Sequence, residues 1–124
     1  MSQKRILIVD DDQGILQILK KNLEPQGYEI LTASDGQEGL KSARQKNPNL
    51  IILDLMLPLL DGYKICRMLK FDRKFKDIPI IMLTSCSQKE DEKLGYEVGA
   101  DLYITKPFKT EDVMEKIKAM LKEP

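Results

Sequence analysis

The 124-residue sequence predicts an α/β fold in which five strands form a doubly wound parallel sheet and five helices cover it. Three observations support this prediction: short apolar runs of strand length, segments with apolar residues at helical spacing, and alternation of the two along the chain. Parallel neighbours need crossover connections, and each crossover here has the pattern of a helix. The chain is 42% apolar, which suits one core, so we expect a single domain over residues 1–124.

The five expected strands are apolar runs separated by turn-forming residues. They cover Arg5–Val9, Tyr28–Ala33, Leu50–Leu53, Ile78–Leu83 and about Asp101–Ile104. Between the first two, apolar residues from Ile15 to Leu23 follow helical spacing before Pro25 and Gly27 end the helix.

The remaining helices begin at residues that favour a helix N-terminus. The second is capped by the segment 34–36 and runs to about Lys46, the third spans about 63–71, and the fifth begins at Thr110 with Val113, Ile117 and Leu121 as its buried stripe. Ser87 and Glu90 resemble a capping box that opens the fourth helix, and Gly95 and Gly99 weaken it. We expect the fourth helix to be the least stable.

Composition limits the function classes. The 20 basic and 20 acidic residues cancel, so no global field favours nucleic acid or a membrane surface, and we expect no direct binding to either. No segment approaches the ~18 consecutive apolar residues of a membrane helix, which predicts a cytoplasmic protein. The sequence leaves open whether the chain is free-standing or a receiver cut from a longer protein, and the lack of an output domain within these 124 residues favours a free-standing regulator.

The cysteines and the missing histidines narrow the chemistry further. Cys66 and Cys86 have no metal-binding spacing and are expected to be free thiols. The chain contains no histidine, which excludes Ser-His and Cys-His nucleophile pairs and histidine general bases. Any histidine chemistry must therefore come from a partner.

Polar residues follow the ends of four expected strands. Asp10 and Asp11 follow the first strand, Asp54 the third, Thr84 the fourth, and Lys106 comes just after the fifth. In an open parallel sheet, ligands bind outside the carboxyl ends of the strands. These side chains should therefore converge on one crevice.

The three carboxylates of this crevice predict a metal site. Two carboxylates ~5 Å apart repel by about 3 kcal/mol at an effective dielectric constant near 20, and a divalent cation would remove that cost. Mg²⁺ suits two or three carboxylates because it keeps several waters and accepts phosphoryl oxygens as further ligands. We therefore predict Mg²⁺ at Asp10, Asp11 and Asp54 in preference to Ca²⁺ or Mn²⁺.

Together, the carboxylates, the hydroxyl and the ammonium of the crevice favour phosphoryl transfer. The Thr84 hydroxyl and the Lys106 ammonium both bind phosphate oxygens. Asp54, the most enclosed carboxylate, could attack a phosphoryl group in line and form an acyl phosphate on the protein itself. Asp12, by contrast, is predicted to cap the first helix.

With these residues, the chain resembles the receiver domain of bacterial two-component response regulators, the family that includes the chemotaxis response regulator. The resemblance covers essentially the whole chain and rests on four motifs in order: Val9-Asp10-Asp11, Asp54 to Pro58 followed by Asp61-Gly62, Leu83-Thr84-Ser85, and Lys106-Pro107-Phe108. It implies a flavodoxin-like sheet in the order 2-1-3-4-5. It also implies a phospho-acceptor signalling switch rather than a turnover enzyme.

The same resemblance implies a role for each site residue. A phosphohistidine on a sensor histidine kinase or histidine phosphotransfer protein would phosphorylate Asp54. Asp11, Asp54 and the backbone carbonyl of Met56 would hold Mg²⁺, and Asp10 would act through a metal-bound water. Lys106 would contact a phosphoryl oxygen, and the Lys106-Pro107 peptide bond is expected to be cis.

The switch itself is also implied by the resemblance. Thr84 would reorient towards the phosphate and Tyr103 would rotate inward, changing the face formed by the fourth helix, the fifth strand and the fifth helix. That face would regulate a downstream protein partner. Leu102 stands where dimerising relatives usually carry an acidic residue, so we expect a monomer or a weak phosphorylation-dependent dimer. Leu59 and Leu60 are expected to form an apolar patch at the rim of the site.

Three alternatives remain open from the sequence. The chain could be a pseudo-receiver that binds a partner without phosphorylation. It could be a phosphohydrolase with an aspartyl-phosphate intermediate, although such enzymes usually carry a second acid at the position of Met56. It could also bind a flavin, although the loop after the first strand is acidic and lacks the small residues that cradle a flavin phosphate.

Overall fold

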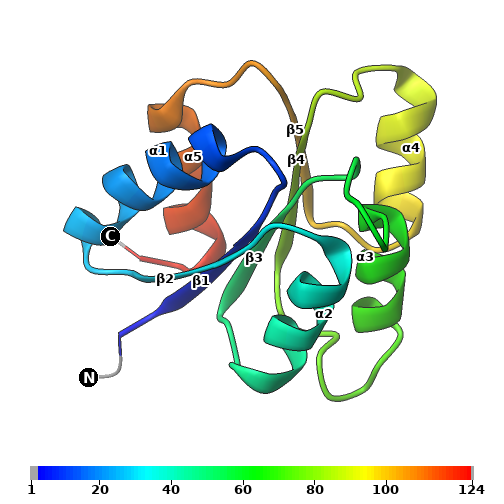
Figure 1. The fold of residues 1–124 in the computed structure, drawn as a ribbon, viewed down its shortest axis with the longest axis horizontal. Helices are drawn as coiled ribbons and strands as arrows, with labels where there is room; N and C mark the ends of the chain where they lie inside the picture. Colours follow the sequence, from blue (N-terminus) through cyan, green and yellow to red (C-terminus); the bar gives the residue numbers. More distant parts are fainter. Residues whose placement is uncertain (1–2, 124) are drawn as a thin grey trace.

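The computed structural model describes residues 3–123 and has one parallel sheet at its centre (Figure 1). Its strands are β1 (Arg5–Val9), β2 (Glu29–Ala33), β3 (Leu50–Leu53), β4 (Ile80–Thr84) and β5 (Leu102–Thr105). Each neighbouring pair is parallel, and the order is β2-β1-β3-β4-β5. The predicted fold class and strand order are confirmed.

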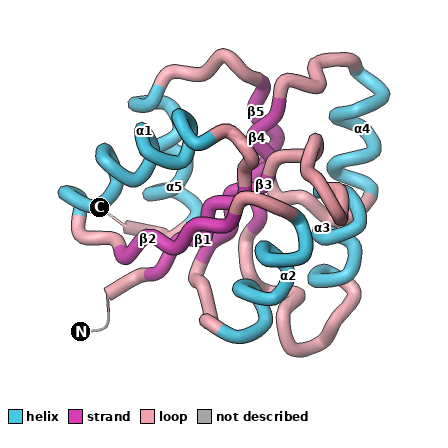
Figure 2. The backbone as a smooth tube through the Cα atoms, in the orientation of Figure 1, coloured by secondary structure: helices cyan, strands magenta, loops and turns pink. Residues whose placement is uncertain are grey.

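Helices cover both faces of the sheet (Figure 2). They are α1 (Gln13–Leu23), α2 (Gly36–Gln45), α3 (Gly62–Lys70), α4 (Lys89–Glu97) and α5 (Thr110–Met120), with a short 3-10 turn, η1 (Glu24–Gln26), after α1. Helices α1 and α5 lie on one face, and α2, α3 and α4 lie on the other. Within residues 3–123, no helix combines the length and apolar character needed to cross a membrane.

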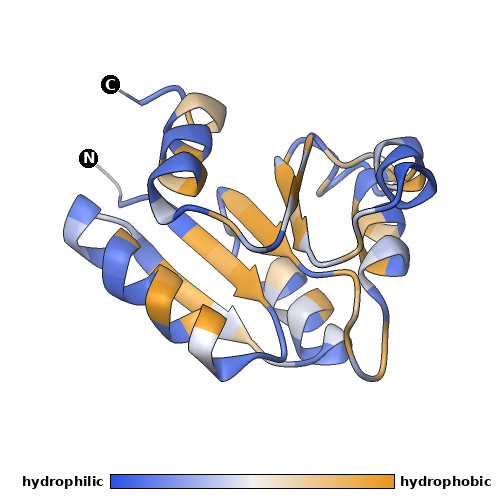
Figure 3. Cartoon of the chain, turned by 90° about the horizontal axis from the view of Figure 1, so that it is seen from above, coloured by the Kyte–Doolittle hydropathy of each residue, from blue (hydrophilic) through white to orange (hydrophobic). Residues whose placement is uncertain are grey.

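The two faces of the sheet carry two separate cores. In β1, Leu7 and Val9 pack into the core beneath α2, α3 and α4, whereas Ile6 and Ile8 pack into the core beneath α1 and α5. Successive side chains of a strand point to opposite faces, and both faces are covered here, so residues 6–9 of β1, all of β3 and residues 80–83 of β4 are apolar (Figure 3). This explains why the strands read as continuous apolar runs in the sequence.

Two predicted boundaries shift for identifiable reasons. Strand β4 begins at Ile80 rather than Ile78, because Pro79 has no N–H to donate to the ladder. The capping box predicted from Ser87 and Glu90 is wrong by one residue. Helix α4 begins at Lys89, and the carboxylate of Asp91 accepts the backbone N–H of Gln88 at 3.2 Å.

Helix α5 matches its predicted stripe in part. Val113 and Ile117 are fully buried beneath the sheet. Leu121 is the C-cap residue and is half-buried against the same core. The apolar stripe of α5 is therefore less buried at its C-terminal end.

A close approach at the end of β3 sets the position of α3. A Cβ atom at Gly62 would overlap with the backbone oxygen of Asp54, so only glycine lets the helix start this near the strand end. The Gly62 N–H donates to the Leu55 carbonyl at 3.1 Å, and the Asp61 carboxylate caps the helix by accepting the Lys64 N–H at 3.0 Å. The helix is thus fixed directly against the residue that ends β3.

The two cysteines are free, as predicted, and differ in environment. The Cys66 thiol is fully buried and lies 3.5 Å from the Val98 carbonyl, to which it donates. Burial raises the pKa of the Cys66 thiol to about 12. Cys86 lies in the loop between β4 and α4 and is partly exposed.

We predict that iodoacetamide at pH 8 alkylates Cys86 in the folded protein and leaves Cys66 unmodified. The thiolate is the reactive form, and the Cys66 thiolate forms only as the pH approaches its raised pKa of about 12. Peptide mass spectrometry measures the two sites separately, and denatured protein, in which both should react, is the control. Equal labelling of both cysteines in the folded state would contradict the buried position of Cys66.

Candidate functional site

The acidic residues predicted from the strand ends meet at one edge of the sheet. The β1–β3 register pairs Val9 with Leu53, which makes Asp10 and Asp54 neighbours at the ends of adjacent strands. The Asp54 N–H donates to the Val9 carbonyl at 3.0 Å and extends this pairing by one residue. Asp10 and Asp54 are only 2% and 4% exposed, whereas Asp11 is exposed.

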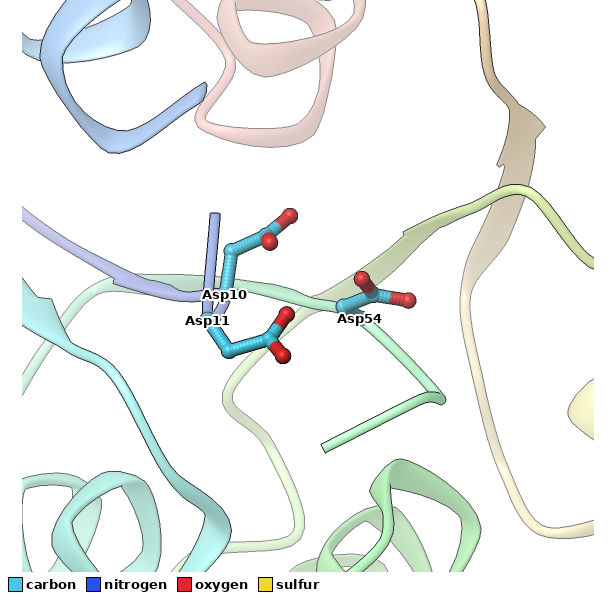
Figure 4. A group of neighbouring side chains, drawn as sticks. All are labelled: Asp10, Asp11 and Asp54. Atoms are coloured by element: carbon cyan, nitrogen blue, oxygen red, sulfur yellow. The ribbon is translucent and has the colours of Figure 1, made fainter. Parts of the chain in front are cut away.

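The three carboxylates are close enough to share a cation. One carboxylate oxygen from each of Asp10, Asp11 and Asp54 lies within 4.8 Å of the other two. Figure 4 shows Asp10 and Asp11 as successive residues with their carboxylates near that of Asp54. Hard divalent cations take such oxygen ligands, and the exposed Asp11 leaves one side of the cluster open to solvent. This donor set fits Mg²⁺.

Lys106 lies between the two buried carboxylates. Its Nζ is 2.8 Å from Asp10 Oδ2 and 3.0 Å from Asp54 Oδ2. The backbone N–H of Lys106 donates to the Thr84 carbonyl at 2.8 Å, which fixes the lysine beside the end of β4. The Lys106 ammonium therefore relieves part of the carboxylate repulsion that the sequence analysis assigned to a divalent cation.

The environment changes the protonation behaviour of these groups. Burial raises the pKa of Asp10 and the Asp54 charge adds to this, while hydrogen bonds from Lys106 and from the Asp12 N–H act against it. Burial alone would lower the pKa of Lys106, but its hydrogen bonds to Asp10 and Asp54 outweigh burial, and the pKa is raised. Lys106 is therefore a stable ammonium at neutral pH.

Asp54 has contacts at both of its oxygens. Oδ2 accepts from Lys106, and Oδ1 accepts the Met56 N–H at 3.2 Å. The Met56 side chain is 65% exposed, so the site is open on this side. The role of the Met56 carbonyl as a metal ligand stays a prediction.

The two residues predicted to switch, Thr84 and Tyr103, meet at the backbone of Cys86. Thr84 is fully buried at the end of β4, and its Oγ1 accepts the Cys86 N–H at 3.3 Å. Tyr103 is also buried, and its hydroxyl donates to the Cys86 carbonyl at 2.6 Å. The sequence singled out Cys86 only as a thiol. Its linking role has no sequence signal because both contacts use backbone atoms.

Two smaller predictions are confirmed at the rim. The Asp12 carboxylate accepts the N–H groups of Gly14 and Ile15 and caps α1. The Lys106-Pro107 peptide bond is cis.

Apolar side chains flank the opening of the site. Leu59 is 69% exposed, whereas Leu60 packs against the core, so the predicted patch of both residues is wrong and only Leu59 of the two is exposed. On the other side of the opening, a groove of about 560 Å³ next to Lys106 is lined by Ile15, Ile18 and Phe108 among others.

Comparison with known proteins identifies the family. The response regulator receiver domain family matches residues 6–118. The alkaline phosphatase synthesis transcriptional regulatory protein PhoP of Bacillus subtilis is 47% identical over 119 residues, which is 96% of this chain and 49% of that protein. The DNA-binding dual master transcriptional regulator RpaA of Synechocystis is 45% identical over 118 residues, which is 95% of this chain and 49% of that protein. The chain thus spans about half the length of these relatives.

A solved structure gives the same result. The crystal structure of a CheY-like response regulator receiver domain protein from Methanospirillum hungatei superposes with a TM-score of 0.91 at 37% identity, covering 98% of this chain and 95% of that one. The fold, the motifs and the sequence similarity therefore all indicate a response regulator receiver domain. The chain belongs to the response regulator receiver domain family, whose members are phosphorylation-based switches of two-component signalling.

Proposed function

We propose that this chain is a phospho-acceptor signalling module in which Asp54 receives a phosphoryl group in a Mg²⁺-dependent reaction. The observation that carries the proposal is the position of Asp54, buried at the end of β3 between the Lys106 ammonium and two further carboxylates. A carboxylate nucleophile needs its own charge and that of the incoming phosphoryl group to be offset. This site offers both an ammonium and a set of cation ligands.

Each residue then has a role. Asp54 is the nucleophile, and Lys106 moves from its carboxylate partners to an oxygen of the phosphoryl group. Asp11, Asp54 and the Met56 carbonyl would hold Mg²⁺, and Asp10 would act through a bound water. When bound, Mg²⁺ supplies charge neutralisation for the phosphoryl oxygens.

A histidine-bearing protein is the proposed phosphoryl donor, either a sensor histidine kinase or a histidine phosphotransfer protein. The chain has no histidine of its own, so a phosphohistidine must come from a partner. The apolar groove at Ile15, Ile18 and Phe108 borders Lys106 and gives a donor protein a surface to pack on beside the acceptor.

The proposed output is a change in the face formed by α4, β5 and α5. A phosphoryl group on Asp54 draws in the Thr84 hydroxyl, which now accepts from the Cys86 backbone, and Cys86 in turn holds Tyr103. The phosphate thereby favours one of two arrangements of this face, which a downstream protein distinguishes. The chain acts as a signalling module rather than a turnover enzyme, in line with relatives that are transcriptional regulators.

We further propose that residues 1–124 form one receiver unit that does not itself bind nucleic acid or a membrane, in line with its net charge of zero. Leu102 on the edge strand β5 is half-buried and uncharged, so a monomer or a weak phosphorylation-dependent dimer is expected rather than a dimer held by charge pairs there.

Asp54→Asn should abolish phosphorylation. Incubation with acetyl phosphate and Mg²⁺ should add one phosphoryl group to the wild-type protein, and intact-mass spectrometry measures the gain. EDTA should prevent the gain. Asp35→Asn is the matched control, because Asn also caps α2 and Asp35 is not one of the predicted site residues. Labelling that persists in a folded Asp54→Asn variant would place the acceptor elsewhere, and a wild-type protein that takes no label would favour the pseudo-receiver.

Asp11→Asn should remove the stabilisation by Mg²⁺. A ligand at ten times its Kd stabilises the folded state by about 1.4 kcal/mol, and this gain should be lost when one of the three carboxylates becomes an amide. In EDTA the variant should lie within about 0.5 kcal/mol of wild type, because Asp11 is exposed. Urea unfolding with and without Mg²⁺ measures both effects. A full Mg²⁺ response in the variant would show that the cation binds away from Asp11.

Lys106→Met should destabilise the metal-free protein by about 2 kcal/mol, because it leaves two buried carboxylates without their ammonium partner. Part of this loss should return on adding Mg²⁺, which supplies charge to the same carboxylates. Lys109→Met is the control at a neighbouring exposed lysine. If both variants unfold at the same urea concentration in EDTA, the Lys106 bridge contributes nothing to stability.

A further inference from the structure

Helix α3 and the linker that follows it carry a local excess of positive charge. Residues 62–76 contain one acidic side chain, Asp72, and six basic ones: Lys64, Arg67, Lys70, Arg73, Lys74 and Lys76. Of these six, only Lys64 and Lys70 have a carboxylate within 4.0 Å in the described part of the chain. The chain as a whole has no net charge, so this excess is a property of one surface.

Two apolar side chains share the exposed stripe of α3. Lys64, Arg67, Met68 and the C-cap residue Phe71 recur at helical spacing, and all four are exposed. Phe71 is 72% exposed, and the Arg67 guanidinium lies over its ring at 5.4 Å from the centroid. Aromatic residues, methionine and arginine are enriched at the centres of protein interfaces. The stripe therefore has the composition of an interface.

Helix α4 carries the opposite charge. It contains two lysines and four acidic residues: Glu90, Asp91, Glu92 and Glu97. Its surface also exposes two apolar side chains, Leu94 at 41% and Tyr96 at 43%. Gly95 is the one residue of α4 that is buried. The acidic and apolar side chains of α4 are therefore available to a partner.

Helices α3 and α4 lie side by side and run in the same direction (Figure 1). The contacts between them follow sequence order in both segments: Tyr63 with Asp91, Cys66 with Val98, and Lys70 with Gly99. Arg67 follows the second of these contacts on α3, and Glu97 precedes it on α4. These two residues therefore lie at about the same level along the helices, and the first turn of α3 lies beside the acidic first turn of α4.

A basic helix beside a parallel acidic helix is complementary to a second copy of itself. A twofold axis that runs between the two helices and parallel to them places α3 of one copy on α4 of the other, and does so twice. Rotation about such an axis keeps each residue at its own level. Arg67 of one copy then lies opposite Glu97 of the other, and Lys64 lies opposite the acidic first turn.

We propose that the surface formed by α3 and α4 is a self-association surface, on which two copies of this chain pair as a weak, salt-dependent, twofold-symmetric dimer. The charges identify the occupant, because the partner must present an acidic helix beside a basic one and this chain carries both. The pairing uses neither β5 nor α5 and does not require phosphorylation. It covers α4, which belongs to the output face under the proposed function, but the pairing itself does not rest on that function.

Charge reversal on one helix at a time tests the pairing. Arg67→Glu puts two contacts between like charges into every dimer and should weaken association about tenfold or more, and Glu97→Arg should do the same. An equimolar mixture of these two variants should associate like wild type, because each contact again joins opposite charges. Lys116→Glu is the matched control, since it makes the same charge change at an exposed residue of α5, on the other face of the sheet. This control should associate like wild type.

Sedimentation velocity of metal-free, unphosphorylated protein measures the dissociation constant of the dimer, over a protein concentration series that reaches the millimolar range. The wild-type dissociation constant should rise between about 0.1 M and about 1 M NaCl, where the Debye length falls from ~10 Å to ~3 Å. Far-UV circular dichroism checks that each variant is folded.

A wild-type protein that stays monomeric throughout the series would overturn the proposal. So would a dimer that Arg67→Glu leaves unchanged, or two folded variants that do not associate when mixed. An equal loss in Lys116→Glu would place the interface at α5 and would also overturn it. The measurement involves no metal and no phosphoryl donor, so its outcome is independent of the role proposed for Asp54.

Discussion

The Lys106 ammonium between Asp10 and Asp54 is the interaction on which the rest of the site depends. It joins the ends of β1 and β3 to the segment after β5, three parts of the chain that are distant in sequence. Two buried carboxylates without a counter-charge would be costly, and burial already raises the pKa of Asp10. The lysine therefore lets the protein keep the buried Asp54 carboxylate next to a second buried acid and still fold.

The parallel sheet explains why these groups meet, and close backbone contacts explain how they connect to the surface. All strands end at the same edge, so the residues after β1, β3, β4 and β5 share one crevice. Gly62 brings α3 against the Asp54 backbone, and Gly95 brings α4 against Tyr103. Two positions without a side chain thus bring Asp54 and Tyr103 into contact with the helices that cover one face.

The residues of the site can be predicted from the sequence, whereas several contacts around the site cannot. Apolar runs that lead into Asp10, Asp54 and Thr84 predict both the strands and the crevice. The apolar residues indicate buried strands, and the polar residues indicate the edge of the sheet where ligands bind. The strand order came from family resemblance, since periodicity carries no information on which strands are neighbours. The α4 cap was misplaced because Ser87 with Glu90 and Gln88 with Asp91 offer similar pairings one residue apart. The backbone contacts of Cys86 carry no side-chain signature at all.

The charges in the crevice imply that a bound cation neutralises more negative charge after phosphorylation than before it. In the structure one ammonium faces three carboxylates, so the crevice is already acidic. An acyl phosphate on Asp54 would replace a single negative charge with about −1.5 to −2. The single positive charge of Lys106 cannot offset the phosphoryl group together with the Asp10 and Asp11 carboxylates. The proposed reaction therefore requires the cation proposed at Asp11, Asp54 and the Met56 carbonyl as the lysine changes partners, which is why the lysine and the acidic cluster form one functional unit.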